Sequence, residues 1–239
     1  MSDDLEQLMM RPIPTPDRPL QGLTVLVVED SRFASEAIRL LSLRSGARIR
    51  RADSLRAAYR HLQVYRPSIV IVDMGLPDGF GADLIAELAA DPVRVPVLLG
   101  MSGDDANRAA AIDAGADGFL AKPVDSLAVF QSSILAVLPP PEGSRTLRLL
   151  SQEVIESDDI AFQDDLSHAV ALVRKGADGP TQDYLAQFLG GVARSAHDNP
   201  LEVAATRLAQ SRAEGRKTSA DLERVKGLLQ DRLAERQVL

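Results

Sequence analysis

Strand-like runs alternate with stretches of helical periodicity between residues 23 and 137. The strand-like runs are LTVLVV from residue 23, ARIRRA from 47, SIVIV from 68, VPVLLGM from 95 and GFLA from 118. Helical spacing of apolar residues follows them over 31–45, 54–65, the segment up to 90, 104–114 and 126–137. This alternation predicts an α/β fold with helices on both faces of a parallel sheet. We expect a doubly wound five-stranded sheet in the order 2-1-3-4-5, a common arrangement of this class.

The chain changes character after this region. The segment LPPPEG, which ends at residue 143, stops the last helix and is typical of a linker. Beyond it only helical periodicity remains, which predicts a second, smaller all-helical domain of about five helices. Near the start, RPIPTPDRP spaces its prolines so that neither helix nor paired strand can propagate. We therefore expect a mobile leader over 1–21, an α/β domain over 22–138, a Pro-rich linker over 139–143 and a helical domain over 144–239.

Apolar stripes locate helices in the second domain. The first stripe contains Leu147, Leu150 and Val154. A later one contains Tyr184, Leu185, Phe188, Leu189 and Val192. A further helix is predicted to begin with Asn199 as its N-cap, because Pro200 and Glu202 follow at the positions that favour a helix start.

Composition excludes several classes of site and of partner. The net charge of −7 disfavours a protein that coats nucleic acid or anionic membrane, although a locally basic face is compatible with it. The chain has no cysteine, which excludes disulfides, thiolate zinc sites, iron–sulfur clusters and cysteine nucleophiles. No signal peptide or apolar run of membrane-spanning length occurs, so we expect a cytoplasmic protein without membrane association.

Carboxylates follow two of the predicted strands at the point where each strand ends. Strand 1 ends in VVED, which places Glu29 and Asp30 there, and strand 3 ends in Asp73. In a parallel sheet the carboxyl ends of the strands share one edge, and ligands bind beside the first strand where the strand order reverses. Clustered carboxylates need a cation, and an oxygen-only site suits Mg²⁺. The sequence therefore predicts a magnesium site at this edge.

The same edge offers groups that suit a phosphoryl ligand. Strand 4 ends in MSGDD, which supplies the hydroxyl of Ser102, and strand 5 leads into AKP, which supplies Lys122. Only four of the 27 basic residues are lysines, and Lys122 is the only one before Lys175. A compact ammonium pairs with a phosphoryl oxygen or carboxylate in a tight pocket better than a planar guanidinium does. The edge is therefore predicted to handle phosphate.

These motifs together resemble a known family. VVED, IVDMGLPDGFG, MSG and FLAKP occur in the order and spacing of the receiver domain of two-component response regulators. The similarity covers just under half of the chain. It implies that Asp73 accepts a phosphoryl group from a histidine kinase. It also implies that Glu29 and Asp30 hold Mg²⁺, together with Asp73 and the backbone carbonyl of Gly75.

The resemblance assigns three further residues. Ser102 and Lys122 would bind the transferred phosphoryl group, and Phe119 would be the aromatic whose rotamer changes on phosphorylation. Serine in place of threonine and phenylalanine in place of tyrosine are mild departures from the family pattern. Physical chemistry agrees with these roles, because phosphoryl transfer is catalysed mainly by positioning and charge neutralisation.

Each of these residues also has an ordinary structural interpretation. Asp30 or Ser102 could cap a helix, Asp73 could form a turn, and Lys122 could be a solvated charge. The common placement of all of them on one sheet edge favours the functional interpretation.

The helical domain resembles no output family, and three interpretations remain open for it. It could bind a protein partner or self-associate, or it could be a helix-turn-helix reader of DNA. The second is disfavoured because residues 142–239 carry 13 basic and 16 acidic residues. The third is a phosphotransfer domain, which needs an exposed histidine such as His168 or His197. We favour an ordinary surface role for both histidines.

The combined prediction is a response regulator, a signalling protein rather than an enzyme. Its upstream partner would be a histidine kinase or a histidine phosphotransfer protein. Its helical domain would act on a downstream protein partner and form a homodimer, with DNA as the less favoured target. A self-contained kinase is excluded, because no Gly-rich phosphate loop occurs in the sequence.

Overall fold

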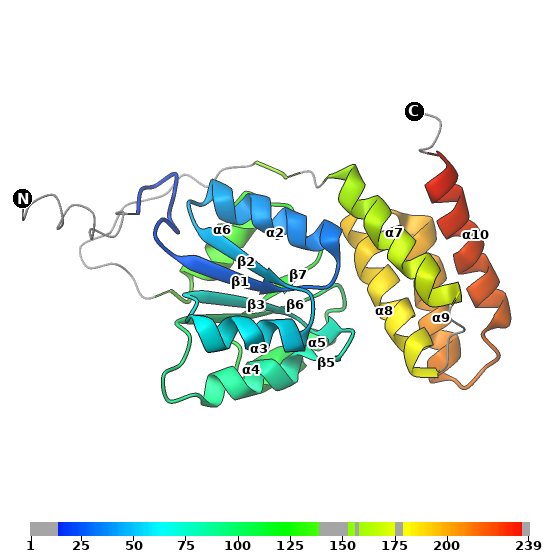
Figure 1. Cartoon of the computed structure of the whole chain (residues 1–239), viewed down its shortest axis with the longest axis horizontal. Coiled ribbons are helices and arrows are strands. Elements are labelled where there is room, and N and C mark those ends of the chain that lie inside the picture. Colours follow the sequence, from blue (N-terminus) through cyan, green and yellow to red (C-terminus); the bar gives the residue numbers. More distant parts are fainter. Residues whose placement is uncertain (1–13, 139–152, 156–157, 175–178, 236–239) are drawn as a thin grey trace, which may run out of the picture.

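The computed structural model describes residues 14–138, 153–155, 158–174 and 179–235. Figure 1 shows an α/β part beside a helical part. The predicted linker and most of the predicted leader lie outside the described residues. Within the described end of that leader, Leu20 is fully buried and its N–H donates to the carbonyl of Ser45 at 2.9 Å. The α/β core therefore begins before the predicted boundary.

The α/β part has the predicted topology. Its strands form one parallel five-stranded sheet in the order β2-β1-β3-β6-β7. The elements are β1 (Thr24–Val28), α2 (Arg32–Arg44), β2 (Arg48–Ala52), α3 (Leu55–Val64), β3 (Ile69–Asp73), α4 (Gly81–Ala90), β6 (Val97–Ser102), α5 (Asn107–Asp113), β7 (Gly118–Ala121) and α6 (Leu127–Leu135). The order corresponds to 2-1-3-4-5 among the parallel strands, so the predicted fold class is confirmed.

Two local features differ from the sequence prediction. The turn after β3 contains a small antiparallel ribbon of β4 (Gly75–Leu76) and β5 (Gly79–Phe80). Helix α5 begins at Asn107 rather than at Asp104. The carboxylate of Asp104 instead accepts the N–H of Ala106 at 2.9 Å, which forms a local turn before the helix.

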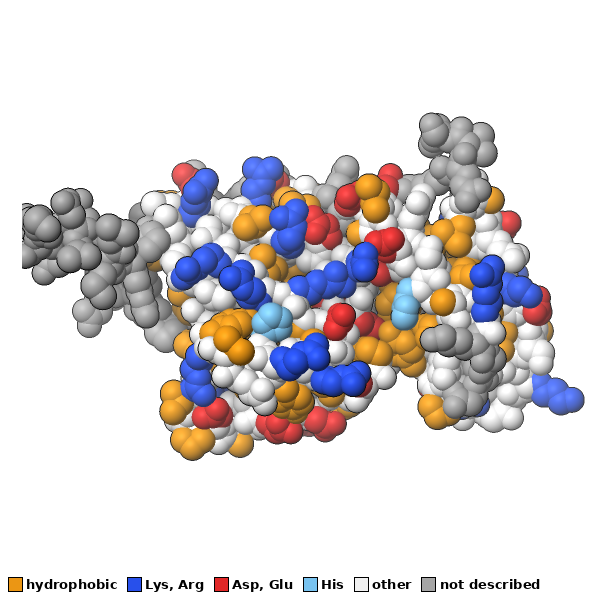
Figure 2. Space-filling model, viewed as in Figure 1, with side chains coloured by type: hydrophobic (Ala, Val, Ile, Leu, Met, Phe, Trp, Pro, Cys, Tyr) orange, Lys and Arg blue, Asp and Glu red, His pale blue; other side chains and the backbone are white. Residues whose placement is uncertain are grey.

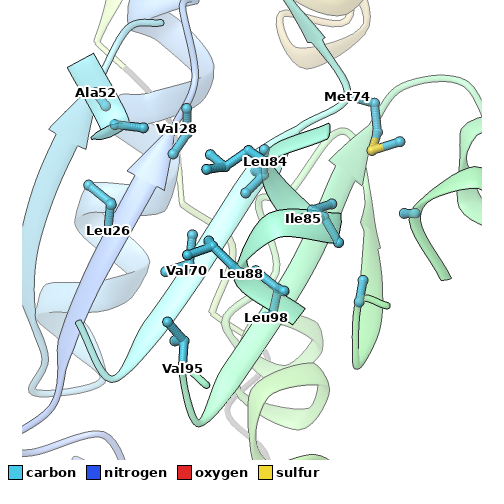
Figure 3. Packing of buried hydrophobic residues seen from close by; sticks show 14 of the residues in the cluster. Leu26, Val28, Ala52, Val70, Met74, Leu84, Ile85, Leu88, Val95 and Leu98 are labelled. Atoms are coloured by element: carbon cyan, nitrogen blue, oxygen red, sulfur yellow. The ribbon is translucent and has the colours of Figure 1, made fainter. Parts of the chain in front are cut away.

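The sheet is buried on both faces. Alternation along β1 places Leu26 and Val28 in one core cluster and Val25 and Val27 in the other. Helices α3, α4 and α5 cover the first face, and α2 and α6 cover the second (Figure 1). Figure 3 shows the first cluster, in which Leu84 of α4 lies over the strands. The near-continuous apolar strands of the sequence are explained by this two-sided burial.

The helical part has a core of its own. Its helices in the described residues are α7 (Asp159–Arg174), α8 (Gly179–Ser195), α9 (Asn199–Ala213) and α10 (Ser219–Glu235). The predicted stripe of α8 supplies buried Leu185, Leu189 and Val192, which pack with Leu208 of α9 and Leu229 of α10. None of the helices in the described ranges has the length and apolarity that crossing a bilayer requires.

Two expectations about the helical part are wrong. Val154 was expected on a helix, but it forms an isolated antiparallel bridge with Ser126, next to the start of α6. Asn199 was expected to cap α9, but the cap is Asp198, whose carboxylate accepts the N–H of Leu201 at 3.2 Å. Asp and Asn are both good caps, so the choice depended on where the helical backbone begins. The other two members of the first stripe lie outside the described residues.

A glycine sets the position of α4 against the end of β3. The N–H of Gly81 donates to the carbonyl of Met74 at 3.0 Å. A Cβ at Gly81 would overlap the backbone carbonyl of Asp73. The helix can therefore begin next to the backbone of Asp73 only because this position has no side chain.

Gly81→Ala is expected to destabilise the protein by about 1–3 kcal/mol, because backbone rather than a flexible side chain must move. The measurement is urea unfolding monitored by circular dichroism. Gly227→Ala in α10 is the matched control, since no heavy atom lies within 4 Å of its added Cβ. The control should gain about 0.5–1 kcal/mol. Equal stability of the two variants would contradict the close approach.

Candidate functional site

Three carboxylates meet at the carboxyl ends of β1 and β3. Glu29 and Asp30 follow β1 directly, and Asp73 is the last residue of the neighbouring strand. One carboxylate oxygen from each residue lies within 4.8 Å of the others. Glu29 is fully buried and Asp73 is 7% exposed. The structure thus brings the acidic residues of the sequence prediction together at one edge of the sheet.

Lys122 follows β7 and extends its ammonium into the same cluster. Its Nζ lies 2.6 Å from Oε2 of Glu29 and 3.2 Å from Oδ2 of Asp73. The lysine side chain is 5% exposed, so this ion-pair network is shielded from solvent. A single ammonium cannot neutralise three carboxylates. The pocket therefore keeps an excess of negative charge.

The electrostatic environment shifts the pKa values of the cluster. Burial is the main cause that raises the pKa of Asp73 to about 7, Glu29 adds to the rise, and Lys122 opposes it. Burial, Glu29 and Asp73 likewise raise the pKa of Asp30 well above its usual range. Burial by itself lowers the pKa of Lys122, but Asp73 and Glu29 outweigh it and raise that pKa above its usual value. The cluster therefore favours uptake of a proton or another cation.

Ser102 and Gly75 lie on the rim of the same pocket, which has a volume of about 710 Å³. The hydroxyl oxygen of Ser102 accepts hydrogen bonds from the backbone N–H of Asp104 at 3.1 Å and from Nδ2 of Asn107 at 3.0 Å. Gly75 donates its backbone N–H to the carboxylate of Asp73, which opposes the rise of the pKa of that group. The hydroxyl proton of Ser102 remains available to a ligand.

Phe119 is not among the residues that line this pocket. It lies on β7 opposite Gly100 and is 8% exposed, inside the core cluster that α4 and α5 cover. The guanidinium of Arg108 lies over its ring, 4.8 Å from the centroid. The predicted switch residue is thus separated from the carboxylates but adjacent to the strand that carries Ser102.

The helical part contributes residues that the sequence did not indicate. The hydroxyl of Tyr184 on α8 donates to Oδ2 of Asp30 at 2.6 Å. Asp165 on α7 accepts the hydroxyl hydrogen of Ser31 at 2.7 Å. Sequence reasoning placed Tyr184 in an apolar stripe and assigned nothing to Asp165. The available signal was the pair Gly190 and Gly191 within that stripe, because such a pair permits close approach of another backbone or side chain.

The two candidate histidines of the helical part lie near the boundary with the sheet. His168 is exposed on α7, and its ring packs edge-on against Phe188 with centroids 5.4 Å apart. His197 follows α8 with a positive φ of 55°, and its side chain is 72% exposed. Its Nε2 lies 3.7 Å from a carboxylate oxygen of Asp125. Both histidines are accessible side chains.

Comparison with known proteins identifies the α/β part. The response regulator receiver domain family matches residues 25–132. This part of the chain is a response regulator receiver domain. The match begins within β1 and ends within α6, so it includes every parallel strand of the sheet and stops before the helical part.

Individual relatives and a solved structure are similar to parts of this chain. The KDP operon transcriptional regulatory protein KdpE of Escherichia coli is 32% identical over 99 residues, or 41% of this chain and 44% of that protein. The transcriptional regulatory protein KdpE of Mycobacterium tuberculosis is 29% identical over 154 residues, or 64% of this chain and 65% of that protein. A crystal structure of a protein described as a response regulator from Chloroflexus aurantiacus is 30% identical with a TM-score of 0.44, covering 48% of this chain and 98% of that one. In both regulators the similarity spans less than two thirds of the relative's own length.

The raised pKa of Asp73 has a consequence for stability in the absence of metal. Between about pH 4 and about pH 7 the Asp73 carboxyl is protonated in the folded chain but ionised in the unfolded chain, so the free energy of unfolding falls as the pH rises through this range. We expect Asp73→Asn in metal-free buffer to be more stable than the wild type above about pH 7, by about 4 kcal/mol at most. The difference should vanish below about pH 4.

Urea unfolding at pH 8 and at pH 3.5 measures this effect. Asp113→Asn is the control, because Asp113 is exposed at the end of α5 and the substitution changes the same charge away from the pocket. A variant of Asp73 that is no more stable than the wild type at pH 8 would contradict the electrostatic description of the cluster.

Proposed function

We propose that this protein is a response regulator that accepts a phosphoryl group on Asp73. The donor is the phosphohistidine of a histidine kinase or of a histidine phosphotransfer protein. The main support is the position of the Asp73 carboxylate, 3.2 Å from the ammonium of Lys122 and within 4.8 Å of the carboxylates of Glu29 and Asp30. A nucleophile, an anion-binding cation and a cation-binding cluster are thereby collected in one pocket.

The residues of the pocket fit a magnesium ion. Their donors are hard carboxylate oxygens, they are close enough to share one ion, and Lys122 leaves them with excess negative charge. Glu29, Asp30, Asp73 and the backbone carbonyl of Gly75 would hold it. When bound, Mg²⁺ neutralises charge on the phosphoryl oxygens during transfer.

The chain's own residues have distinct roles in the proposed transfer. An oxygen of the Asp73 carboxylate attacks phosphorus, and the P–N bond of the donor histidine breaks. The nitrogen keeps the electron pair and takes a proton from water, while an acyl phosphate forms on Asp73. Lys122 pairs with a phosphoryl oxygen, and the Ser102 hydroxyl donates a hydrogen bond to another.

A conformational change caused by phosphorylation would be transmitted through β6 and β7. The Ser102 hydroxyl oxygen accepts hydrogen bonds from Asp104 and Asn107, so a movement of this hydroxyl toward the phosphoryl group would disturb both contacts. Asn107 begins α5, which with β7 encloses the side chain of Phe119. A new charge on Asp73 is thereby coupled to packing around α5, the kind of local event that reshapes a surface.

The helical part is the proposed output domain, following the division of the chain into residues 22–138 and 144–239. Its own core supports a separate folding unit that acts on a protein partner or forms a homodimer. The protein would work in the cytoplasm as a signalling protein. A phosphotransfer role for His168 or His197 is kept as an alternative, supported by the exposure of both side chains.

One observation favours nucleic acid as a second candidate partner. Residues 31–66 contain nine arginines but only Glu36 and Asp53 as acidic residues, in a chain with a net charge of −7. Figure 2 shows Lys and Arg side chains gathered on the face formed by α2, β2 and α3. The exposed arginines of this face include Arg48, Arg50 and Arg51 on β2. Such a face can contact a phosphate backbone without reading its sequence.

The phosphoacceptor assignment is tested by labelling. Asp73→Asn should abolish phosphoryl uptake from acetyl phosphate or a phosphohistidine donor, because the amide is not a nucleophile for this reaction. Removal of Mg²⁺ with a chelator should do the same to the wild type. Asp113→Asn should be labelled normally. Wild-type labelling of the Asp73 variant would refute the assignment.

Lys122→Ala tests the role of the ammonium. The variant should be labelled at least about tenfold more slowly than the wild type, because a charge-assisted contact to the phosphoryl group is lost. Labelling kinetics with acetyl phosphate at fixed Mg²⁺ concentration provide the measurement. An unchanged rate and an unchanged level of labelling would remove Lys122 from the mechanism.

The output is tested by light scattering with and without beryllofluoride, which mimics the phosphoryl group. If the helical part forms a homodimer after phosphorylation, the mimic increases the mass of the wild type in solution toward that of a dimer. A parallel DNA-binding measurement at stated salt concentration should show weak, strongly salt-dependent binding that disappears when Arg48, Arg50 and Arg51 are replaced by glutamine, if the basic face is used. Sequence-specific DNA retention without a mass change would favour a transcription factor instead.

A further inference from the structure

The pocket around Asp73 is lined in part by the protein's own helical part. Its lining comes from both parts of the chain, with Glu29, Asp73 and Lys122 on one side and Gln187 and Gly191 of α8 on the other. In Figure 1 the helical part lies beside the carboxyl ends of the sheet strands. This is the edge from which any phosphodonor must approach.

Helix α8 comes close to the pocket through small residues. A Cβ at Gly191 would lie 3.8 Å from Nζ of Lys122. The side-chain amide of Gln187 lies against Gly75, and the guanidinium of Arg194 lies against Gly103, so closely that a Cβ on either glycine would overlap them. Side chains of α8 therefore lie against two glycines of the receiver domain that line the pocket.

The hydroxyl of Tyr184 contacts the carboxylate of Asp30, which is one of the proposed Mg²⁺ ligands. It donates to Oδ2 of Asp30 at 2.6 Å, and its ring packs with Phe188, with centroids 5.8 Å apart. A lone pair that accepts this hydrogen bond is not free to bind a metal ion in the same direction. A Mg²⁺ ion that binds this oxygen from the same side would have to displace the tyrosine hydroxyl.

A second contact fixes the helical part to the start of α2. Asp165 accepts three hydrogen bonds, from the hydroxyl of Ser31 at 2.7 Å and from the backbone N–H groups of Arg32 at 2.8 Å and Phe33 at 3.0 Å. A carboxylate is favourable here because the first N–H groups of a helix lack backbone partners and carry positive partial charge. Phe33 also packs against Phe162, with centroids 5.6 Å apart. The start of α2, next to Glu29 and Asp30, is therefore a built docking point.

We propose that α7 and α8 form an intramolecular cover over the phosphoacceptor pocket, which competes with Mg²⁺ and with the phosphodonor for the same face of the receiver domain. This inference rests on the proposed function of Asp73. A donor protein must bring its histidine to a carboxylate that is 7% exposed, so the cover has to leave first. Docking of the helical part weakens the binding of such a ligand by a certain factor, and the bound ligand then weakens docking by the same factor.

Mg²⁺ affinity tests the Tyr184 contact without any use of phosphoryl transfer. Calorimetric titration with MgCl₂ should show that Tyr184→Phe binds Mg²⁺ about fivefold or more tightly than the wild type, since only the competing hydroxyl is removed. Tyr65→Phe is the matched control, because Tyr65 ends α3 away from this pocket, and its affinity should be unchanged. Equal affinities of Tyr184→Phe and the wild type would overturn the proposed competition.

The distance between the two parts provides a second test. Since the chain has no cysteine, spin labels can be placed at Arg56→Cys on α3 and Arg224→Cys on α10, both exposed positions. The doubly labelled wild type should show one narrow distance distribution in metal-free buffer and a longer, broader one with Mg²⁺ and beryllofluoride. Asp165→Asn should reach that second distribution at a lower beryllofluoride concentration, whereas Asp231→Asn, exposed on α10, should behave as the wild type.

The two levels of the proposal fail in different ways. If the wild type does not take up phosphoryl groups and Asp73→Asn makes no difference, the proposed function falls. If labelling is normal but beryllofluoride leaves the distance distribution unchanged, the cover alone is refuted.

Discussion

The rest of the molecule depends on one constraint, the burial of several negatively charged carboxylates at one edge of the sheet. The parallel topology places the ends of β1 and β3 side by side, so that Glu29, Asp30 and Asp73 cannot avoid one another. Lys122 compensates only part of that charge. A pocket in this condition stabilises any partner that brings positive charge or donates hydrogen bonds to it. The fold thus keeps these carboxylates together although their mutual repulsion is unfavourable without a bound cation or hydrogen-bond donor. Such unfavourable arrangements are common at functional sites.

The helical part meets this need from within the same chain. Tyr184 donates a hydrogen bond to one carboxylate, and Asp165 accepts hydrogen bonds from two N–H groups at the start of α2. These hydrogen bonds, which are accompanied by an aromatic contact between Phe33 and Phe162, can be exchanged for hydrogen bonds to water or to a ligand at modest cost. An interface that relies on such exchangeable hydrogen bonds suits two alternative states.

The spacing of apolar residues along the sequence predicted the α/β and helical parts, but it did not predict the contact between them. The apolar runs of β1 and β3 identified buried parallel strands, and the residues that end them identified the acidic cluster, because strand ends of a parallel sheet share an edge. Tyr184 could not be identified in this way, since a tyrosine in a helical stripe is usually a core residue. Asp165 is one of many aspartates on helices. Their roles depend on the relative position of two separately folded cores, about which local patterns carry no information.

The burial of Lys122 also matters for chemistry directed at amines. It is the only lysine in the first 174 residues of the chain, and its side chain is 5% exposed. Acylating reagents and lysine-modifying enzymes therefore meet a shielded target throughout this region. Covalent modification at that single position would report each opening of the pocket, so the protein carries a natural reporter group within the acidic cluster.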